Sequence, residues 1–354
     1  MKVNAKALRR QAAAGIAVIA LALAGCGGNE GDKGGAAGEY ANLSGELKAS
    51  GASFPDAYYQ EVIGAFKEAA PNVTVTYNST GSGTGKSEFG EGLTDFAGTD
   101  SLVKDDDGIK EEFLYVPTVA APITVTYNLE GVDKLQLSAD TVAKIFQGDI
   151  KTWNDPAVVA DNPDAKLPST KITIAHRSDG SGTTKNFTKY LEKASKAWKL
   201  GSGDTVEWPK DSQGGAKNTG VAQIVKSTAG AIGYVDLSDA KASGLTFAAI
   251  KNKDGNYVVP SLEGTTAGLE GAEIAEDLSY NPLDAAGAEA YPITAPTFIL
   301  VKAKYDDKKK AELVKAFLTF LLNDGQEFAS DVDFAPLPDE LKKKALAQLD
   351  KIES

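Results

Sequence analysis

Residues 171–194 read KITIAHRSDGSGTTKNFTKYLEKA, and the fold class can be worked out from this stretch. A β-branched, alternating run ends at Arg177, a turn of small residues follows, and a pattern of helical period begins directly after the turn. Strand and helix patterns alternate in the same way from residue 46 to the C-terminus. We therefore predict an α/β fold.

Most segments after residue 46 show a helix or a strand pattern. In the first helix, Tyr58, Val62 and Phe66 share one face, and Pro71 marks the end. Strands are predicted at 46–53, 72–79, 95–100, 114–128, 171–177, 231–237, 246–251 and 294–303. Helices are predicted at 54–71, 83–92, 138–149, 183–198, 220–230 and 308–329.

Two segments, AAPITVTYN at 120–128 and YPITAPTFILVKA at 291–303, have the pattern of strands that could run between two lobes. A chain that crosses twice builds one lobe, domain I, from 46–125 and 293–354. The other lobe, domain II, then comes from 126–292. Two crossing strands would form a hinge, with a ligand cleft between the lobes.

The composition is that of a globular protein large enough for two domains, with 354 residues, 42% hydrophobic and 24% charged. Its 49 acidic and 37 basic residues give a formal net charge of −12. This charge opposes nucleic-acid binding, which requires basic surface. The chain has one Cys and one His, and its acidic residues lack the spacing of a calcium-binding loop. We therefore predict no metal site and no cofactor.

Residues 1–25 have the pattern of a signal peptide, with a basic start and a short apolar run. The sequence LAGC at 23–26 resembles the bacterial lipobox, in which the cysteine, here Cys26, is lipidated. The alternative is a plain export signal with an incidental cysteine. Residues 26–45 are rich in glycine and are predicted to be a flexible tether. The protein is then anchored at the outer face of the cell membrane.

The turn after Arg177 carries groups that suit a tetrahedral oxyanion. Arg177 offers a guanidinium fork, Ser181 and Thr183 offer hydroxyls, and Gly182 exposes backbone N–H at a helix start. Asp179 could simply neutralise Arg177 in a structural ion pair. We favour a role in which Asp179 orients the guanidinium while a ligand takes the remaining donors.

Two other helix starts carry similar chemistry. Ser53 lies just before Pro55, where its hydroxyl could hold a ligand or merely cap the helix. The turn TGSGTGKS at 80–87 resembles a P-loop but has Thr80 where that motif requires glycine. We favour a turn that presents N–H groups to a smaller oxyanion. A solvent-exposed turn without a ligand is the alternative.

Asp100 ends the predicted strand 95–100 and could be an ordinary turn residue. Beside an anion, its carboxylate is repulsive unless the anion carries a proton. Such an acceptor would select protonated phosphate and reject sulfate, which is fully ionised near neutral pH. A competing interpretation is a hydrolase that pairs Ser181 with His176. It is disfavoured because His176 should point away from Arg177 and no G-x-S-x-G elbow is present.

Seven segments, in order along the chain, resemble the phosphate-binding proteins of bacterial high-affinity phosphate (Pst-type) ABC transporters. They are GASFPDAYY, STGSGTGKSEF, TDFAGTDSL, IFQGDIKTWNDP, HRSDGSGTTKNFTKYL, TAGAIGYVDL and FAPLP. The resemblance covers nearly the whole chain after residue 46. It implies a two-lobed, periplasmic-binding-protein-like fold of type II and a monomeric binding protein, not an enzyme. The implied partners are inorganic phosphate and ABC permease subunits with a cytoplasmic ATPase.

Carried over position by position, the resemblance implies phosphate contacts from both lobes. Ser53, where the family has threonine, acts with the backbone N–H of Phe54; Ser82 is a helix-start donor; Asp100 accepts the phosphate proton. The other contacts are Arg177, Ser181, Gly182 and Thr183, with Asp179 orienting Arg177. The turn at 81–86 departs from the family's commoner GSSGG-type turn, which leaves its donor atoms open. A sulfate or molybdate receptor is the nearest alternative, followed by an exported phosphatase.

Overall fold

The structure is a computed structural model that describes residues 37–354, and residues 36–354 form one compact unit. The predicted signal peptide, Cys26 and the first part of the predicted tether lie outside the described residues. Ordered structure begins earlier than the sequence suggested, with helix α1 (Ala37–Tyr40). The reason is Tyr40, whose buried ring packs edge-on against Phe66 and Phe320, at centroid distances of 5.6 and 5.8 Å.

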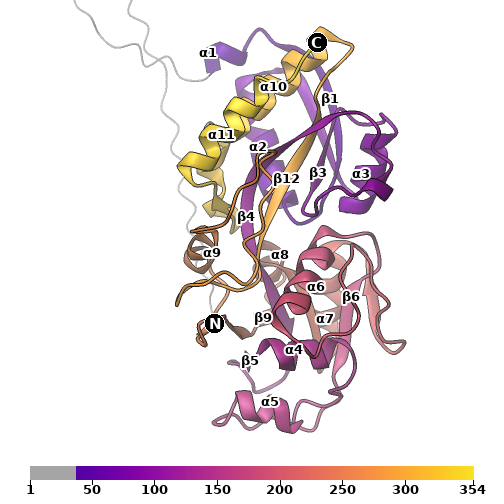
Figure 1. Cartoon of the computed structure of the whole chain (residues 1–354), viewed down its shortest axis with the longest axis vertical. Helices are drawn as coiled ribbons and strands as arrows, with labels where there is room; N and C mark the ends of the chain where they lie inside the picture. The colour runs from indigo at the N-terminus through magenta and orange to yellow at the C-terminus, as the bar shows by residue number, and fades with distance from the viewer. Residues whose placement is uncertain (1–36) are drawn as a thin grey trace, which may run out of the picture. The chain divides into compact units, whose positions relative to one another are not determined.

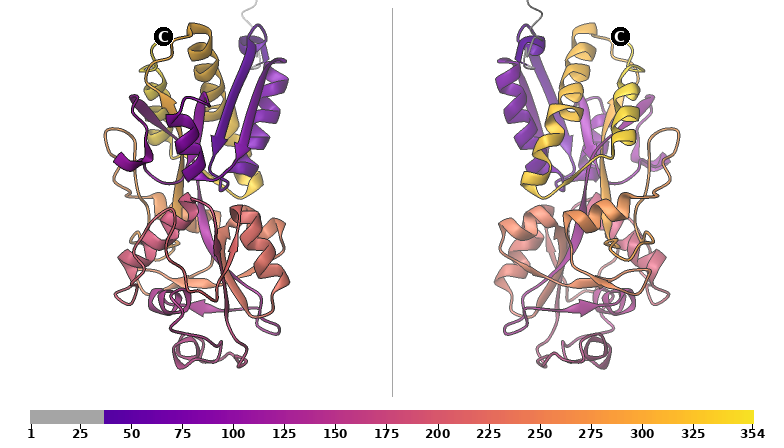
Figure 2. Two further views of the ribbon diagram at one scale, coloured as in Figure 1. Left: turned by 90° about the vertical axis from the view of Figure 1, so that its right-hand side faces the viewer. Right: turned by 90° about the vertical axis from the view of Figure 1, so that its left-hand side faces the viewer.

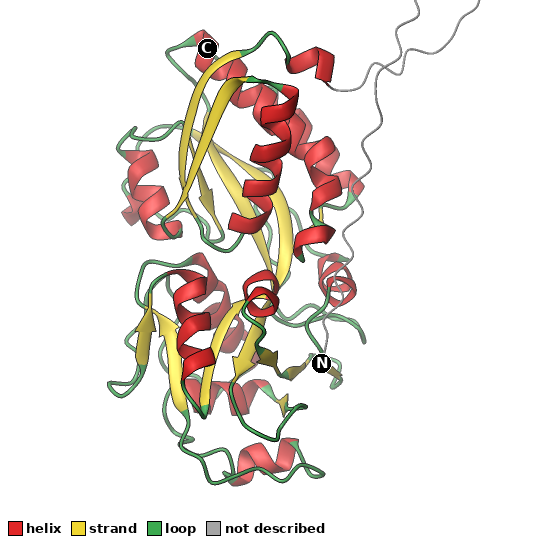
Figure 3. Cartoon of the chain, turned by 180° about the vertical axis from the view of Figure 1, so that it is seen from behind, coloured by secondary structure: helices red, strands yellow, loops and turns green. Residues whose placement is uncertain are grey.

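One mixed sheet runs through both lobes in the order β2-β1-β3-β12-β4-β8-β6-β7. We call the lobe formed by the predicted domain I lobe I and the other lobe II. In lobe I, β1, β2 and β3 are parallel, and β12 runs antiparallel between β3 and β4. The strands are β1 (Ser44–Gly51), β2 (Asn72–Ser79), β3 (Phe96–Thr99), β4 (Phe113–Tyr127), β12 (Thr294–Lys302) and β13 (Ala335–Pro336). Helices cover this part of the sheet (Figures 1 and 3): α2 (Asp56–Ala69), α3 (Ser82–Gly90), α10 (Lys308–Leu322) and α11 (Asp339–Leu349).

Lobe II is built around the second half of β4 and strands β8, β6 and β7, with β6 parallel to both β8 and β7. The strands of this lobe are β6 (Thr173–Arg177), β7 (Gln213–Gly215), β8 (Ala231–Asp236) and β9 (Thr246–Phe247), with a small sheet of β5 (Gln136–Leu137), β10 (Ala249–Lys251) and β11 (Tyr257–Val258). The helices are α4 (Ala139–Phe146), α5 (Pro156–Asp161), α6 (Gly182–Ala194), α7 (Lys217–Ser227) and α8 (Leu237–Ala242), while α9 (Leu262–Leu269) packs on β4 and β12.

Strand β4 connects the lobes, as Figure 2 shows. Up to Pro122 it pairs with β12, and from Ile123 onward it pairs with β8. The return connection passes the same point, because the Ile123 N–H donates to the Ile293 carbonyl and the Tyr291 hydroxyl donates to the Ile123 carbonyl. The two connections therefore lie side by side where the lobes meet, as expected of a hinge.

The apolar run that predicted β4 reflects burial on both faces. All residues from Tyr115 to Tyr127 are buried, the threonines at positions 118, 124 and 126 included, so neither face of the strand is open to solvent. The predicted strand 246–251 is divided by Ala248 into β9 and β10, which join different sheets. The predicted helix 308–329 ends at Leu322 and is followed by a 3₁₀ turn at Asp324–Phe328.

Candidate anion-binding site

Arg177 is the last residue of β6 and is buried, with 4% of its surface exposed. Its Nε and Nη2 donate to the two carboxylate oxygens of Asp179, at 2.8 and 2.5 Å, and its Nη1 donates to Oδ1 of Asn218 at 2.6 Å. Burial alone would raise the pKa of Asp179, but hydrogen bonds and charge from Arg177 lower it. The guanidinium is therefore fixed in a bidentate pair, as expected of an orienting carboxylate.

Helix α6 begins directly after the small-residue turn. Ser181 is its N-cap: the Ser181 Oγ accepts from the Thr184 N–H at 3.1 Å, and the Ser181 N–H donates to the Asp204 carbonyl at 2.9 Å. The hydroxyl of Thr183 is buried and has no hydrogen-bond partner among the residues that the structure describes. The first turn of α6 thus places free backbone N–H groups and a buried hydroxyl at one point.

The turn at the start of α3 meets this turn from lobe I. Gly81 has φ +95°, and a side chain there would lie 2.6 Å from Oδ2 of Asp179. A side chain on Gly182 would lie 2.6 Å from the Ser82 Oγ, so glycine is required at both positions. The Gly83 N–H donates to the Gly180 carbonyl at 3.0 Å, which joins the two turns directly.

Ser53 and Phe54 lie at the start of α2 and are both buried. The Ser53 hydroxyl makes no cap hydrogen bond to this helix; its Oγ accepts instead from the N–H of Asn218 in lobe II, at 3.4 Å. Both residues line a cavity of about 220 Å³ together with Lys217 and Asp236 of lobe II. Ser53 is therefore an interlobe residue and not a helix cap.

Asp100 follows β3 and is 3% exposed. Burial raises its pKa to about 7, although the Thr297 hydroxyl, which donates to Oδ1 at 2.7 Å, and the charge of Arg177 both lower it. The Ser82 Oγ accepts from the Asp100 N–H at 3.2 Å. In its ionised form this carboxylate can accept a hydrogen bond from a ligand that carries a proton.

The structure thus brings the predicted residues together where the lobes meet. Ser53 contacts Asn218 beside Arg177, and Ser82 and Asp100 lie against Gly182. The predicted residues are Ser53, Phe54, Ser82, Asp100, Asp179, Arg177, Ser181, Gly182 and Thr183.

His176 turns away from this site. Its ring stacks on Trp208 at 5.2 Å, and its Nδ1 lies 2.9 Å from the backbone oxygen of Arg177. Burial lowers its pKa. These contacts satisfy His176 as a strand residue and do not pair it with Ser181. Among residues 37–354, no cluster of His, Cys, Asp and Glu could hold a metal ion.

Sequence reasoning missed three polar residues of the site. Asn218 bridges Arg177 and Asp236, donating from Nδ2 to Oδ2 of Asp236 at 2.8 Å. Asn186 of α6 donates from Nδ2 to the Asp100 carbonyl at 2.6 Å, across the lobes. The third is Thr297, on β12. Only Asn218 carried a usable signal, because GGAKNTG at 214–220 is another Gly-rich turn before a helix.

Comparison with known proteins identifies the family. The PBP superfamily domain matches residues 36–325. The phosphate-binding protein PstS of Methanocaldococcus jannaschii is 40% identical over 309 residues, with 79% of each chain covered, and PstS 3 of Mycobacterium tuberculosis is 36% identical over 97% of this chain and 98% of its own. This chain belongs to the PstS family of phosphate-binding proteins.

The fold agrees with the family. A high-affinity periplasmic phosphate-binding protein, solved with phosphate bound, superposes with a TM-score of 0.72 at 19% identity, over 86% of this chain and 93% of its own. The predicted two-lobed α/β fold is therefore confirmed. No helix within residues 37–354 of this PstS family member is long and apolar enough to cross a membrane.

Proposed function

We propose that this protein binds inorganic phosphate between its lobes and delivers it to an ABC importer. The observation that carries the proposal is the meeting of a fixed guanidinium, Arg177, with a carboxyl group that titrates near neutral pH, Asp100, beside helix starts from both lobes. The names of the relatives, which describe phosphate-binding proteins, support the same ligand.

Each lobe would supply a different part of the donor set. Arg177 uses three of its five N–H groups in bonds to other described residues, so two remain for an oxyanion. Gly182 and Thr183 would add backbone N–H groups and a hydroxyl, with Ser181 as a further donor. From lobe I, Ser53, the backbone N–H of Phe54 and Ser82 would complete the set.

Asp100 would decide which oxyanion is accepted. Its carboxylate would accept a hydrogen bond from the proton that phosphate still carries near neutral pH. Sulfate has no proton to donate there, so its oxygens would face the carboxylate directly and be repelled. Specificity would come from this unfavourable contact with the wrong ligand.

We also propose the division into domains, with domain I at 46–125 and 293–354 and domain II at 126–292. It is supported by the two connections at Ile123 and Ile293. Residues 1–25 would be a signal peptide, and Cys26 and the tether would anchor a monomer to the outer face of the membrane. The protein would be no enzyme: Ser181 caps α6, and His176 is engaged elsewhere.

Calorimetric titration of residues 37–354 with phosphate, sulfate and molybdate tests the proposal. We expect tight binding of phosphate and weak binding of the other two at neutral pH. Equal affinities for phosphate and sulfate would contradict the role of Asp100. Absence of phosphate binding would contradict the proposed function, and turnover of a chromogenic phosphate ester would contradict the non-enzymatic assignment.

A further inference from the structure

Lys86, the lysine of the P-loop-like turn, is buried one helical turn after Ser82 in α3. Only 1% of its side chain is exposed. Its Nζ lies 2.8 Å from Oδ2 of Asp107 and 2.8 Å from Oδ2 of Asp204. The phosphate-binding role proposed above does not use this lysine, although burying an ammonium is costly and so calls for an explanation.

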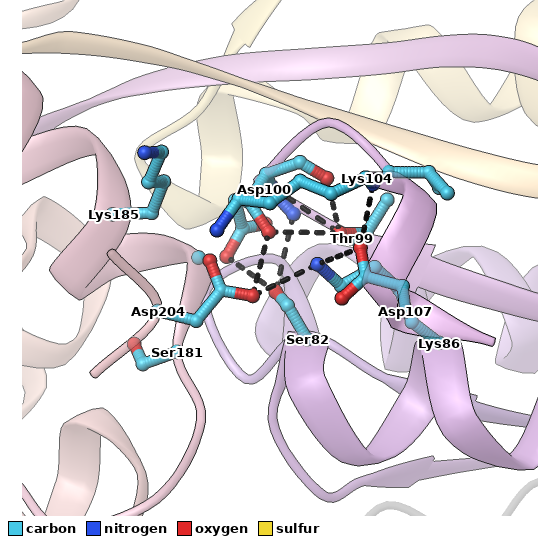
Figure 4. A network of polar contacts seen from close by, with 12 residues as sticks. Ser82, Lys86, Thr99, Asp100, Lys104, Asp107, Ser181, Lys185 and Asp204 are labelled. Carbon is cyan, nitrogen blue, oxygen red and sulfur yellow. Dashed lines mark hydrogen bonds and ion pairs between the residues drawn. The ribbon is translucent and has the colours of Figure 1, made fainter. Parts of the chain in front are cut away.

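The two carboxylates belong to different lobes. Asp107 ends a 3₁₀ turn (Asp105–Asp107) that packs on α3 within lobe I. Asp204 belongs to lobe II, because its carbonyl accepts the Ser181 N–H at 2.9 Å and the neighbouring Gly203 N–H donates to Oγ1 of Thr188 at 3.3 Å. One ammonium therefore makes two ion pairs of equal length, one within its lobe and one across the interface (Figure 4).

A second group of lobe I also binds Asp204. The hydroxyl of Ser101 donates to Oδ2 of Asp204 at 3.2 Å, and Ser101 directly follows Asp100. Asp204 is thus held from α3 on one side and from the end of β3 on the other. The Asp204 side chain is 16% exposed, so solvent screens its pair with Lys86 less than it would screen a surface pair.

We propose that Lys86 and Asp204 form a latch that holds the lobes together and sets how slowly phosphate leaves; this inference rests on the phosphate-binding function proposed above. The latch joins the two helices whose first turns would hold the ligand, since Lys86 is on the helix that starts at Ser82 and Asp204 holds the N–H of the α6 N-cap, Ser181. Opening the lobes breaks the pair to Asp204.

Opening would leave Lys86 with a partner, because Asp107 moves with it in lobe I. The ammonium is therefore not stranded when the lobes separate, which keeps opening reversible. The latch adds one ion pair to the closed form alone, and interactions made only in the bound state act mainly on the dissociation rate. Lys86 and Asp204 are thus assigned to residence time and not to contact with phosphate.

The experiment compares Asp204→Asn with Asp107→Asn. Both changes remove one carboxylate from Lys86 at the same distance, but only the first lies across the lobes. We expect Asp204→Asn to speed phosphate dissociation in stopped flow by about tenfold or more, as for other truncated charge pairs at interfaces. We expect Asp107→Asn to leave this rate within about twofold and to act mainly on the melting temperature.

A double-mutant cycle with Lys86→Met completes the test. The dissociation rate should show coupling between Lys86 and Asp204 and none between Lys86 and Asp107. Equal rates for the two asparagine variants, or no coupling to Asp204, would overturn the latch. Should Asp204→Asn fail to fold, Asp204→Glu keeps the charge and displaces it, and an unchanged rate would overturn the latch equally. Wild-type protein that binds no phosphate would instead refute the proposed function.

Discussion

The two halves of the site are organised in different ways. In lobe II, Arg177 donates its hydrogen bonds to Asp179 and Asn218 of the same lobe. In lobe I, Asp100 has partners in both lobes: Thr297 of lobe I donates to its carboxylate and Asn186 of lobe II donates to its carbonyl. The charges that act on its pKa, those of Arg177, Asp236 and Asp204, all belong to lobe II. The part of the proposed site around Arg177, the donor half, can therefore form before the lobes meet. The part around Asp100, the acceptor half, obtains some of its surroundings only when the lobes close.

Removing the donor half should have the largest effect. Arg177→Ala deletes the two N–H groups proposed for phosphate and leaves Asp179 and Asn218 without their partner. We expect calorimetry to show a loss of affinity of about a thousandfold, from two charge-assisted hydrogen bonds. Arg177→Lys is the matched control, because it keeps the charge without the fork. Full affinity in the lysine variant would show that charge suffices and that the bidentate geometry does not matter.

The donor half was accessible from sequence because it is local. Arg177, Asp179, Ser181, Gly182 and Thr183 lie within seven residues, and the Arg177–Asp179 pair spans two positions. The polar residues around Asp100 could not be predicted in this way. Thr297 is an ordinary strand residue 197 positions from Asp100, and its importance appears only when β12 pairs beside β3.

The helices and strands were also predicted with uneven success. β4 was predicted at 114–128 and lies at Phe113–Tyr127, because its apolar and threonine residues are typical of a strand buried on both faces. Helices that carry a weaker apolar pattern were missed, such as the lysine-rich α11. α5 was also missed, although Asp155 caps it and Pro156 occupies its first position, a signal that the sequence contained. α5 could therefore have been predicted from local residues, whereas no local residue indicates that Thr297 lies beside Asp100.

Changing the acceptor half should alter selectivity more than affinity. Asp100→Asn removes the negative charge and supplies an N–H donor at the same place. Sulfate would then no longer be repelled, and we expect the preference for phosphate over sulfate to fall on the order of 100-fold in parallel titrations. Arg177→Ala should weaken both anions together and leave their ratio nearly unchanged. A constant ratio in Asp100→Asn would refute the division of roles between the two halves.

The two carboxylates should also respond to pH with opposite signs. Asp100 has a pKa raised to about 7 from 3.8, so its contribution to stability is present below pH 4 and is lost as pH rises to 7, at most about 4 kcal/mol. Asp179 has a lowered pKa, so its contribution is present above the unfolded value and is lost as pH falls. Both contributions are measured as the difference in the free energy of unfolding by urea between ligand-free wild type and each variant, Asp100→Asn or Asp179→Asn. The measurements run from about pH 3 to about pH 8 in steps of about one pH unit. If the two differences changed with pH in the same direction, the opposite pKa shifts of Asp100 and Asp179 would be contradicted.

The smallest effects should separate the two halves most sharply. Thr297→Val removes the hydrogen bond that lowers the pKa of Asp100, so this pKa should rise further and the pH at which phosphate affinity changes should shift upward. Affinity at the optimal pH should fall only about threefold.

Asn218→Ala removes the side chain that bridges Arg177 and Asp236. It should lower the affinity for phosphate and for sulfate alike, about tenfold, without moving the pH profile. Calorimetry across pH distinguishes them. A shifted profile in Asn218→Ala would show that the two halves are coupled, and an unshifted profile in Thr297→Val would show that Thr297 does not set the pKa of Asp100.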